Sequence, residues 1–242
     1  MQDFIHKLLQ LIGYDLYRYP DGCERLIPHL KRLLTAYRIN GVIDVGANVG
    51  QFALNMRSLA PDIEIHSFEP NPYVYNTLAA NAARDKRWVT HACALGQSHG
   101  KIVLNITASS DFSSCRVANE FGARQFNDSL SVTEAIEVEM RTLDEVLDGI
   151  SAEIKNSLLV KLDTQGFDMQ VLQGATKGLK NAKIIVTEAS LQPIYEGAAL
   201  LPEVLEFMTS RGFTLSGFFP VTRSNNLGVI ESDCVFVRGQ MA

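Results

Sequence analysis

The sequence predicts an α/β fold whose core is a mostly parallel β-sheet flanked by helices. Short runs of β-branched residues alternate with longer amphipathic stretches along most of the 242 residues, and this alternation indicates successive βαβ units. The first run leads into a glycine-bearing turn and then into a helix. Two runs near the C-terminus are separated by a turn instead of a helix, so we expect the sheet to end in an antiparallel hairpin.

The composition is that of an ordinary soluble globular protein, and the length suits one large domain. Hydrophobic residues make up 46% and charged residues 20% of the sequence. The net charge of -5 and the scattered lysines and arginines argue against a nucleic-acid substrate. No stretch reaches the roughly 18 apolar residues of a membrane span. The N-terminus lacks the pattern of a secretion signal, so a cytoplasmic location is expected.

The cysteines and histidines show no metal-ligand spacing. Cys23, Cys93, Cys115 and Cys234 are spread along the chain without a Cys-x-x-Cys pair, which indicates reduced thiols. None of the five histidines stands in a His-Glu-x-x-His arrangement. We therefore expect no dedicated metal site.

The first forty residues carry apolar residues at helical spacing on both sides of a turn at 19–22. Residues 1–40 are interpreted as an N-terminal helical extension and residues 41–242 as the main domain. Five strands are expected next, at 41–45, 64–68, 88–92, 158–162 and 183–187. The hairpin is expected at 213–218 and 234–237. Residues 96–143, with possible strands at 101–107 and 136–140, are interpreted as an insertion or flap over the sheet.

The turn after the first strand predicts a small-molecule site. Gly46 and Gly50 allow the backbone to approach a ligand, and the helix that follows offers unpaired N–H groups at its start. A dinucleotide-binding turn has the spacing Gly-x-Gly-x-x-Gly, whereas the spacing here is Gly-x-x-x-Gly. Asp44 precedes the glycines, and its carboxylate would repel a pyrophosphate but attract an ammonium group. These features favour S-adenosylmethionine over NAD.

Glu69 follows the second strand, where one carboxylate can accept hydrogen bonds from both hydroxyls of a ribose. Each feature also has a simpler explanation. Asp44 is compatible with a helix N-cap, the two glycines with an ordinary tight turn, and Glu69 with a solvated strand end. The combination at this spacing favours a cofactor site.

These motifs resemble those of the FkbM-type methyltransferases. The resemblance implies a Rossmann-like class I methyltransferase fold, a seven-stranded sheet of order 3-2-1-4-5-7-6 with strand seven antiparallel, and S-adenosylmethionine as the cofactor. It is carried by segments 44–50, 68–71, 94–96, 141–144 and, most specifically, 160–167 with 171–175. The cofactor-binding residues that it implies are Asp44, Gly46, Ala47, Asn48, Gly50, Glu69, Pro70, Asn71, Ala94 and Leu95. The family usually has Asp-x-Glu-Gly where this chain has Asp163-Thr164-Gln165-Gly166, so the resemblance does not carry a metal-binding or acid/base role over to position 165.

Three residues at strand ends are catalytic candidates. Asp163 and Glu188 end the fourth and fifth strands, and a carboxylate there could hold an acceptor hydroxyl and take its proton. Lys161 lies on the same face as Asp163 and could keep it ionised, although the two could also form a purely structural ion pair. His66 and His91 are weaker candidates for the base, and Trp88 is interpreted as a packing residue. A cover for the acceptor could come from Asp111, Phe112, Ser113, Ser114 and Arg116.

The sequence thus predicts an O-methyltransferase that acts on a hydroxyl of a sugar, a glycan or a secondary metabolite, as the resemblance implies. One alternative is a non-catalytic binding or assembly module on the same fold. Another is an NAD-dependent oxidoreductase, against which the glycine spacing and Asp44 both argue. The acceptor and the oligomeric state are not predicted.

Overall fold

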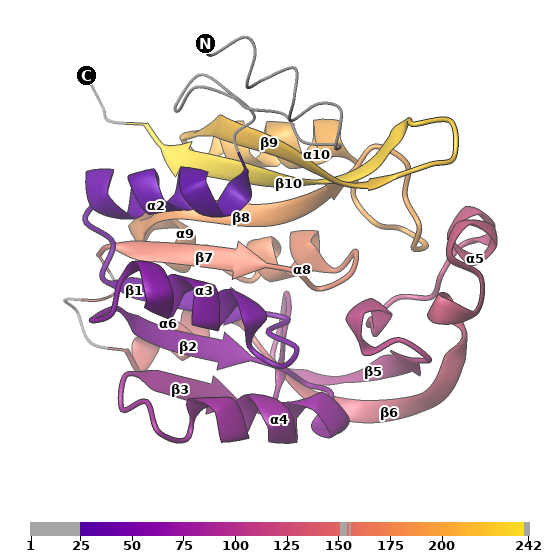
Figure 1. Cartoon of the computed structure of the whole chain (residues 1–242), viewed down its shortest axis with the longest axis horizontal. Helices are drawn as coiled ribbons and strands as arrows, with labels where there is room; N and C mark the ends of the chain where they lie inside the picture. The colour runs from indigo at the N-terminus through magenta and orange to yellow at the C-terminus, as the bar shows by residue number, and fades with distance from the viewer. Residues whose placement is uncertain (1–24, 151–153, 155, 240–242) are drawn as a thin grey trace, which may run out of the picture.

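The computed structural model describes residues 25–150, 154 and 156–239. Its main sheet has seven strands in the order β3-β2-β1-β7-β8-β10-β9 (Figure 1). All neighbouring strands are parallel except β10, which runs antiparallel to β8 and β9. The strands are β1 (Gly41–Val45), β2 (Glu64–Phe68), β3 (Trp88–His91), β7 (Leu158–Leu162), β8 (Ala182–Ser190), β9 (Phe213–Arg223) and β10 (Val229–Arg238). The predicted strand order and the terminal hairpin are confirmed.

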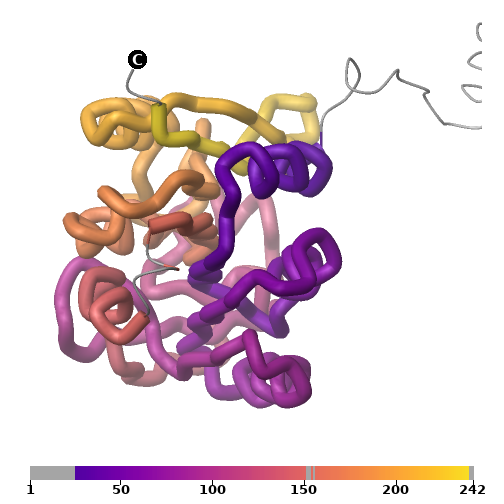
Figure 2. Tube along the Cα trace, turned by 90° about the vertical axis from the view of Figure 1, so that its left-hand side faces the viewer, coloured from indigo at the N-terminus to yellow at the C-terminus, as the bar shows by residue number. Residues whose placement is uncertain are grey.

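Helices cover both faces of this sheet, which gives three layers (Figure 2). Each face has its own apolar core, because β1 and β7 are buried along their whole length and direct alternate side chains to opposite sides. One face carries α2 (Leu26–Ala36), α3 (Gln51–Leu59) and α4 (Pro72–Ala82). The other carries α6 (Leu143–Asp148), α8 (Asp168–Gln173), α9 (Gly178–Asn181) and α10 (Leu201–Ser210).

The predicted flap, 96–143, contributes two strands to a second, three-stranded sheet of order β4-β6-β5, whose third strand precedes the flap. The long strands β5 (Gly100–Thr107) and β6 (Val132–Arg141) pair antiparallel, and β4 (Ala94–Leu95) joins the base of β6. Two short 3-10 helices, η1 (Ser110–Phe112) and η2 (Asn127–Leu130), and the helix α5 (Glu120–Phe126) connect the long strands. This unit stands beyond the ends of β1 and β2, on the right of Figure 1. This unit therefore projects past the carboxyl edge of the main sheet and borders the space beyond it.

Of the two predicted N-terminal helices, the second is α2, and the first lies outside the described residues. Leu30 and Leu34 of α2 belong to the same core as Ile184 and Val235 of the sheet. The division of the chain at residue 40 stays a prediction. Among the described residues, no helix is both long and apolar enough to cross a membrane.

Candidate active site

A cavity of about 460 Å³ opens at the carboxyl ends of β1, β2 and β7, where an open α/β sheet is expected to bind ligands. Its lining includes most of the predicted site: Asp44, Gly46, Ala47, Asn48, Glu69, Pro70, Ala94, Leu95, Lys161, Asp163 and Glu188. Gly50 and Asn71 are not part of the lining. The structure thus brings together residues that are up to 144 positions apart, from Asp44 to Glu188.

The turn after β1 needs its glycines for packing as much as for ligand approach. Gly46 has φ +75°, and a Cβ there would lie 2.0 Å from the carbonyl oxygen of Asp163. Gly50 has φ +94° and begins α3 as its N-cap; a Cβ at Gly50 would meet the ring of Trp88 at 2.7 Å. The reason for Gly50 is therefore contact with a buried aromatic ring, and Asp44 is not the helix cap.

Glu69 faces the cavity with both carboxylate oxygens fixed by backbone donors. The N–H of Asn48 donates to Oε2 at 2.8 Å, and the N–H of Asn71 donates to Oε1 at 2.8 Å. Asn71 itself caps α4 by accepting from the N–H of Tyr73, so it orients Glu69 from behind the cavity wall. Burial raises the pKa of Glu69 to about 7, although these hydrogen bonds oppose the rise. Each oxygen keeps a lone pair for a ligand hydroxyl.

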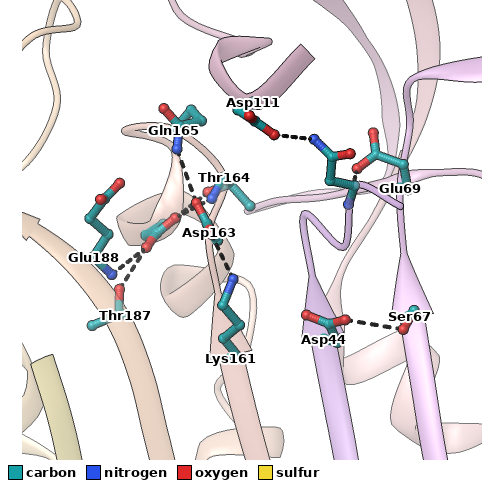
Figure 3. A network of polar contacts seen from close by, with 12 residues as sticks. Asp44, Ser67, Glu69, Asp111, Lys161, Asp163, Thr164, Gln165, Thr187 and Glu188 are labelled. Carbon is teal, nitrogen blue, oxygen red and sulfur yellow. Dashed lines mark hydrogen bonds and ion pairs between the residues drawn. The ribbon is translucent and has the colours of Figure 1, made fainter. Parts of the chain in front are cut away.

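A polar row crosses the sheet below the cavity. Ser67, Asp44 and Lys161 are register partners on neighbouring strands β2, β1 and β7, so their side chains share one face. The indole N–H of Trp88 donates to Ser67 Oγ. Ser67 Oγ in turn donates to Asp44 Oδ2 at 3.2 Å (Figure 3). Asp44 Oδ1 is buried without a hydrogen-bond partner, and burial raises the pKa of Asp44 to about 6. Trp88 packs as predicted, and it also orients Asp44 through Ser67.

Lys161 and Asp163 form an ion pair at the end of β7, with 2.7 Å between Nζ and Oδ2. Burial lowers the pKa of Lys161, but the charges of Asp163 and Asp44 more than offset this, so the pKa rises and the ammonium is retained. Burial would raise the pKa of Asp163, yet the charge and hydrogen bond of Lys161 and a hydrogen bond from Gln165 lower it overall. Asp163 is therefore a stable anion, as the position of Lys161 predicted.

Glu188 also lines the cavity, but it lies inside β8, which continues to Ser190, and not at the end of the strand as predicted. Its backbone N–H donates to Asp168, which also accepts from Thr164 and Thr187 and so ties β8 to the turn after β7 (Figure 3). Among the described residues, none forms a hydrogen bond or ion pair with the Glu188 carboxylate. Burial, followed by repulsion from Glu231, raises the pKa of Glu188 well above its usual value.

Glu231 is a site residue that the sequence did not identify. It lies on β10 opposite Ser190, is only 4% exposed and lines the cavity close to Glu188. Burial raises its pKa to about 7. The sequence does contain a signal for Glu231. A glutamate directly follows the apolar pair Val-Ile at the start of this strand, and a carboxyl in an apolar strand is rarely buried without a function.

The segment between β5 and α5 covers the cavity. Asp111, Phe112, Ser113 and Ser114 line it, as predicted for a cover, whereas Arg116 turns away and donates to the carbonyl of Glu196. Asn48 Nδ2 donates to Asp111 Oδ1 at 2.8 Å across the cavity mouth. His66 and His91 hydrogen-bond to each other at 3.2 Å and do not line the cavity, which removes their support as general bases.

The charges around the cavity are strongly unbalanced. Among the described lining residues there are six carboxylates and one lysine: Asp44, Glu69, Asp111, Asp163, Glu188, Glu231 and Lys161. As these carboxyl groups ionise, the lining attracts cationic ligands and repels pyrophosphates and other anions.

Comparison with known proteins places the chain in a family. A family model described as the Methyltransferase FkbM domain matches residues 44–215. The chain is 27% identical over 185 residues to the 2-O-methyltransferase NoeI of Sinorhizobium fredii (strain NBRC 101917 / NGR234), covering 74% of each protein. It is 25% identical over 196 residues to the methyltransferase sdnD of Sordaria araneosa, covering 72% of this chain and 74% of that protein.

A solved structure agrees in fold. The methyltransferase FkbM from Methylobacillus flagellatus KT superimposes with a TM-score of 0.50 at 12% identity, over 82% of this chain. The match spans only 43% of that protein, so this chain covers less than half of its length. The fold is that of the class I methyltransferases, and the chain belongs to the FkbM methyltransferase family.

Proposed function

We propose that the protein transfers a methyl group from S-adenosylmethionine to a hydroxyl oxygen of a sugar, glycan or other small metabolite. Membership of the FkbM methyltransferase family indicates S-adenosylmethionine as the cofactor. The similarity to a protein named 2-O-methyltransferase supports oxygen as the methyl acceptor.

The charge imbalance of the cavity is the observation that carries the proposal. S-adenosylmethionine has a sulfonium and an ammonium cation against one carboxylate, whereas NAD brings a pyrophosphate. Six carboxylates facing one lysine therefore suit the first ligand and disfavour the second. In this assignment Asp44, with its unpartnered oxygen, faces the methionine ammonium, and Glu69 accepts hydrogen bonds from the ribose.

Glu188 suits the role of general base better than Asp163 does. An acceptor hydroxyl loses its proton as the new C–O bond forms, so the base needs a carboxylate oxygen that no other group holds. The Glu188 carboxylate meets this need once it is ionised, whereas Asp163 is paired with Lys161 and holds a proton less readily than a free carboxylate. Lys161 then acts by holding Asp163. In this proposal Glu188 is the base, and Asp163 is an anion held by Lys161.

Calorimetry with S-adenosylmethionine, its demethylated product and NAD tests the cofactor assignment. We expect dissociation constants of roughly micromolar order for the first two and no binding of NAD. Incubation with a panel of glycans and hydroxylated metabolites, with detection of S-adenosylhomocysteine, then tests catalysis. Binding of NAD alone would overturn the proposal. Cofactor binding without turnover of any hydroxylated acceptor would favour the non-catalytic binding module.

The base assignment is tested by comparing Glu188→Gln with Asp163→Asn. Each change preserves size and removes one charge. For the base we expect a fall in kcat of roughly 10²- to 10⁴-fold with the cofactor dissociation constant nearly unchanged. For Asp163 we expect weaker cofactor binding and a smaller change in kcat. The reverse pattern would return the base role to Asp163.

A further inference from the structure

Gln165, the residue at which this chain departs from the family pattern, lies in a strained turn beside Asp163. Its φ of +53° is in the left-handed region, which is unfavourable for a residue with a side chain. Ser114 Oγ donates to its carbonyl oxygen at 2.7 Å, which helps to hold this conformation. Backbone strain of this kind persists only where the surrounding structure holds the residue in place.

The side-chain amide of Gln165 has one possible orientation. Its Nε2 lies 3.0 Å from Asp163 Oδ1, and an ionised carboxylate can only accept, so the NH₂ group must face Asp163. The Oε1 atom then faces the Tyr195 hydroxyl at 2.9 Å, and the single proton of that hydroxyl is shared between Gln165 Oε1 and the carbonyl oxygen of Phe112, which lies 3.1 Å away. Tyr195 is 2% exposed, and Gly166 makes room for it, because a Cβ at Gly166 would lie 3.0 Å from the Tyr195 ring.

These contacts leave Asp163 with one donor on each oxygen, Lys161 Nζ on Oδ2 and Gln165 Nε2 on Oδ1. Its side chain is nevertheless 40% exposed toward the cavity, so lone pairs remain for a ligand. A carboxylate held by two donors is a weak proton acceptor and a persistent negative charge. An ionised glutamate at position 165 could not donate to Asp163 and would repel it, so the pair would have to share a proton.

We propose that Gln165, oriented by Tyr195, is a positioning residue that keeps Asp163 ionised and aimed into the cavity, so that Asp163 binds a cationic group of the ligand and does not accept a proton. The identity of that ligand as S-adenosylmethionine rests on the proposed function, whereas the effect of Gln165 on Asp163 does not.

The ionisation of Asp163 in the ligand-free full-length protein is the direct readout. Carbon-13 NMR of labelled aspartate follows the titration of its carboxyl group. The other charged groups that influence Asp163 are unchanged in every variant: Lys161, Asp44, Glu69, Asp168, Glu188, Glu231 and Asp233.

We expect the pKa of Asp163 to rise in the order wild type, Tyr195→Phe, Gln165→Met and Gln165→Glu. Tyr195→Phe frees the amide without removing it, Gln165→Met removes the donor, and Gln165→Glu adds a second carboxylate that must share a proton. Gln173→Met, at an exposed position of α8, is the matched control and leaves the titration unchanged. An unchanged pKa of Asp163 in Gln165→Met and Gln165→Glu would overturn the proposal, and Tyr195→Phe provides the test if either of them fails to fold.

Ligand binding gives the second readout. Methylthioadenosine lacks both the sulfonium and the ammonium of S-adenosylmethionine and serves as the neutral comparison. Gln165→Met removes the donor that holds Asp163 Oδ1, so the Asp163 carboxylate should meet the ligand cation less well, and the preference for S-adenosylmethionine over methylthioadenosine should fall by about 5- to 10-fold. An unchanged preference would overturn the binding role of Asp163. Failure of the wild-type protein to bind S-adenosylmethionine would contradict the proposed function, and the titration would still decide the role of Gln165.

Discussion

Glu69 is the single residue through which the ribose assignment can be tested most directly. Glu69→Ala removes the acceptor for ligand hydroxyls, so the cofactor should bind about 1–3 kcal/mol more weakly. Because the side chain also accepts from the N–H of Asn48, part of this loss would come from the loop after β1. Glu69→Gln keeps one oxygen acceptor, so its cofactor dissociation constant, measured by calorimetry, should lie between those of the wild type and Glu69→Ala. An unchanged dissociation constant in Glu69→Ala would mean that the ribose lies elsewhere.

The two glycines of the turn after β1 should respond differently to a side chain. Gly46→Val places atoms against the carbonyl of Asp163, so cofactor binding should be lost together with much of the stability. Gly50→Ala presses on the Trp88 ring, so thermal unfolding should shift while the remaining folded protein still binds cofactor. Gly149→Ala, where φ is -87° and the nearest atom is 3.5 Å away, is the control. Full cofactor binding by folded Gly46→Val would contradict the placement of this turn.

Much of the site could be predicted from single residues, because strand ends in a parallel sheet converge on one edge. Asp44, Glu69 and Asp163 follow from that rule, and Glu188 was found by it although β8 continues to Ser190. Glu231 and Tyr195 could not be found in this way. Glu231 reaches the site through an antiparallel strand with register shifts, and Tyr195 through a loop, and neither position is set by local sequence.

The segment from Ser109 to Arg116 is the element that closes the cavity mouth. It contacts the turn after β1 through a hydrogen bond from Asn48 Nδ2 to Asp111 Oδ1. This hydrogen bond is exposed and therefore contributes little to folding stability. Asp111→Ala should therefore leave the melting temperature nearly unchanged while bound cofactor dissociates several-fold faster, as measured by stopped-flow displacement. Asp128→Ala, also acidic and exposed on η2, is the matched control. An unchanged dissociation rate in Asp111→Ala would show that this contact does not restrain the cover.

At the level of elements, the buried strands were predictable and the small sheet was only partly so. β1 and β7 are buried on both faces and therefore read as continuous apolar runs. The predicted strand at 101–107 covers β5 except for its first residue, whereas the one at 136–140 covers only the second half of β6. The first half of β6 is exposed on both faces and therefore has no apolar alternation. The pairing of β5 with β6 depends on a contact across the whole covering segment, which no local pattern specifies.

The molecule as a whole concentrates buried carboxyls with raised pKa values at one edge. Burial raises the pKa to about 6 for Asp44 and Asp233 and to about 7 for Glu69 and Glu231. Each group binds its proton more tightly in the folded state, so its contribution to stability is complete below about pH 4 and is lost as the pH rises through 6 to 7. The ligand-free protein should therefore melt at a lower temperature at pH 8 than at pH 5.5.

Differential scanning calorimetry at constant ionic strength checks this pH dependence. Glu231→Gln should flatten it, because one of the responsible groups is removed. S-adenosylmethionine should raise the melting temperature more at pH 8 than at pH 5.5, since its cations then meet ionised carboxylates. A wild-type melting temperature that rises from pH 5.5 to pH 8 would contradict the burial of these charges.

The pairing of β1 with both β2 and β7 also sets the order in which the protein can assemble. β2 follows β1 closely in the chain, but β7 comes from a distant part of the sequence, and the cavity lies where β1 and β7 end side by side. Closing such a long loop is slow, because its entropy must be lost before the contacts form. During synthesis, a nascent chain that ends before Leu158 has the glycine turn and Glu69 but lacks Lys161 and Asp163. Lys161 and Asp163 therefore join the cavity only when β7 has paired with β1, so the site is complete only when the central strands are in place.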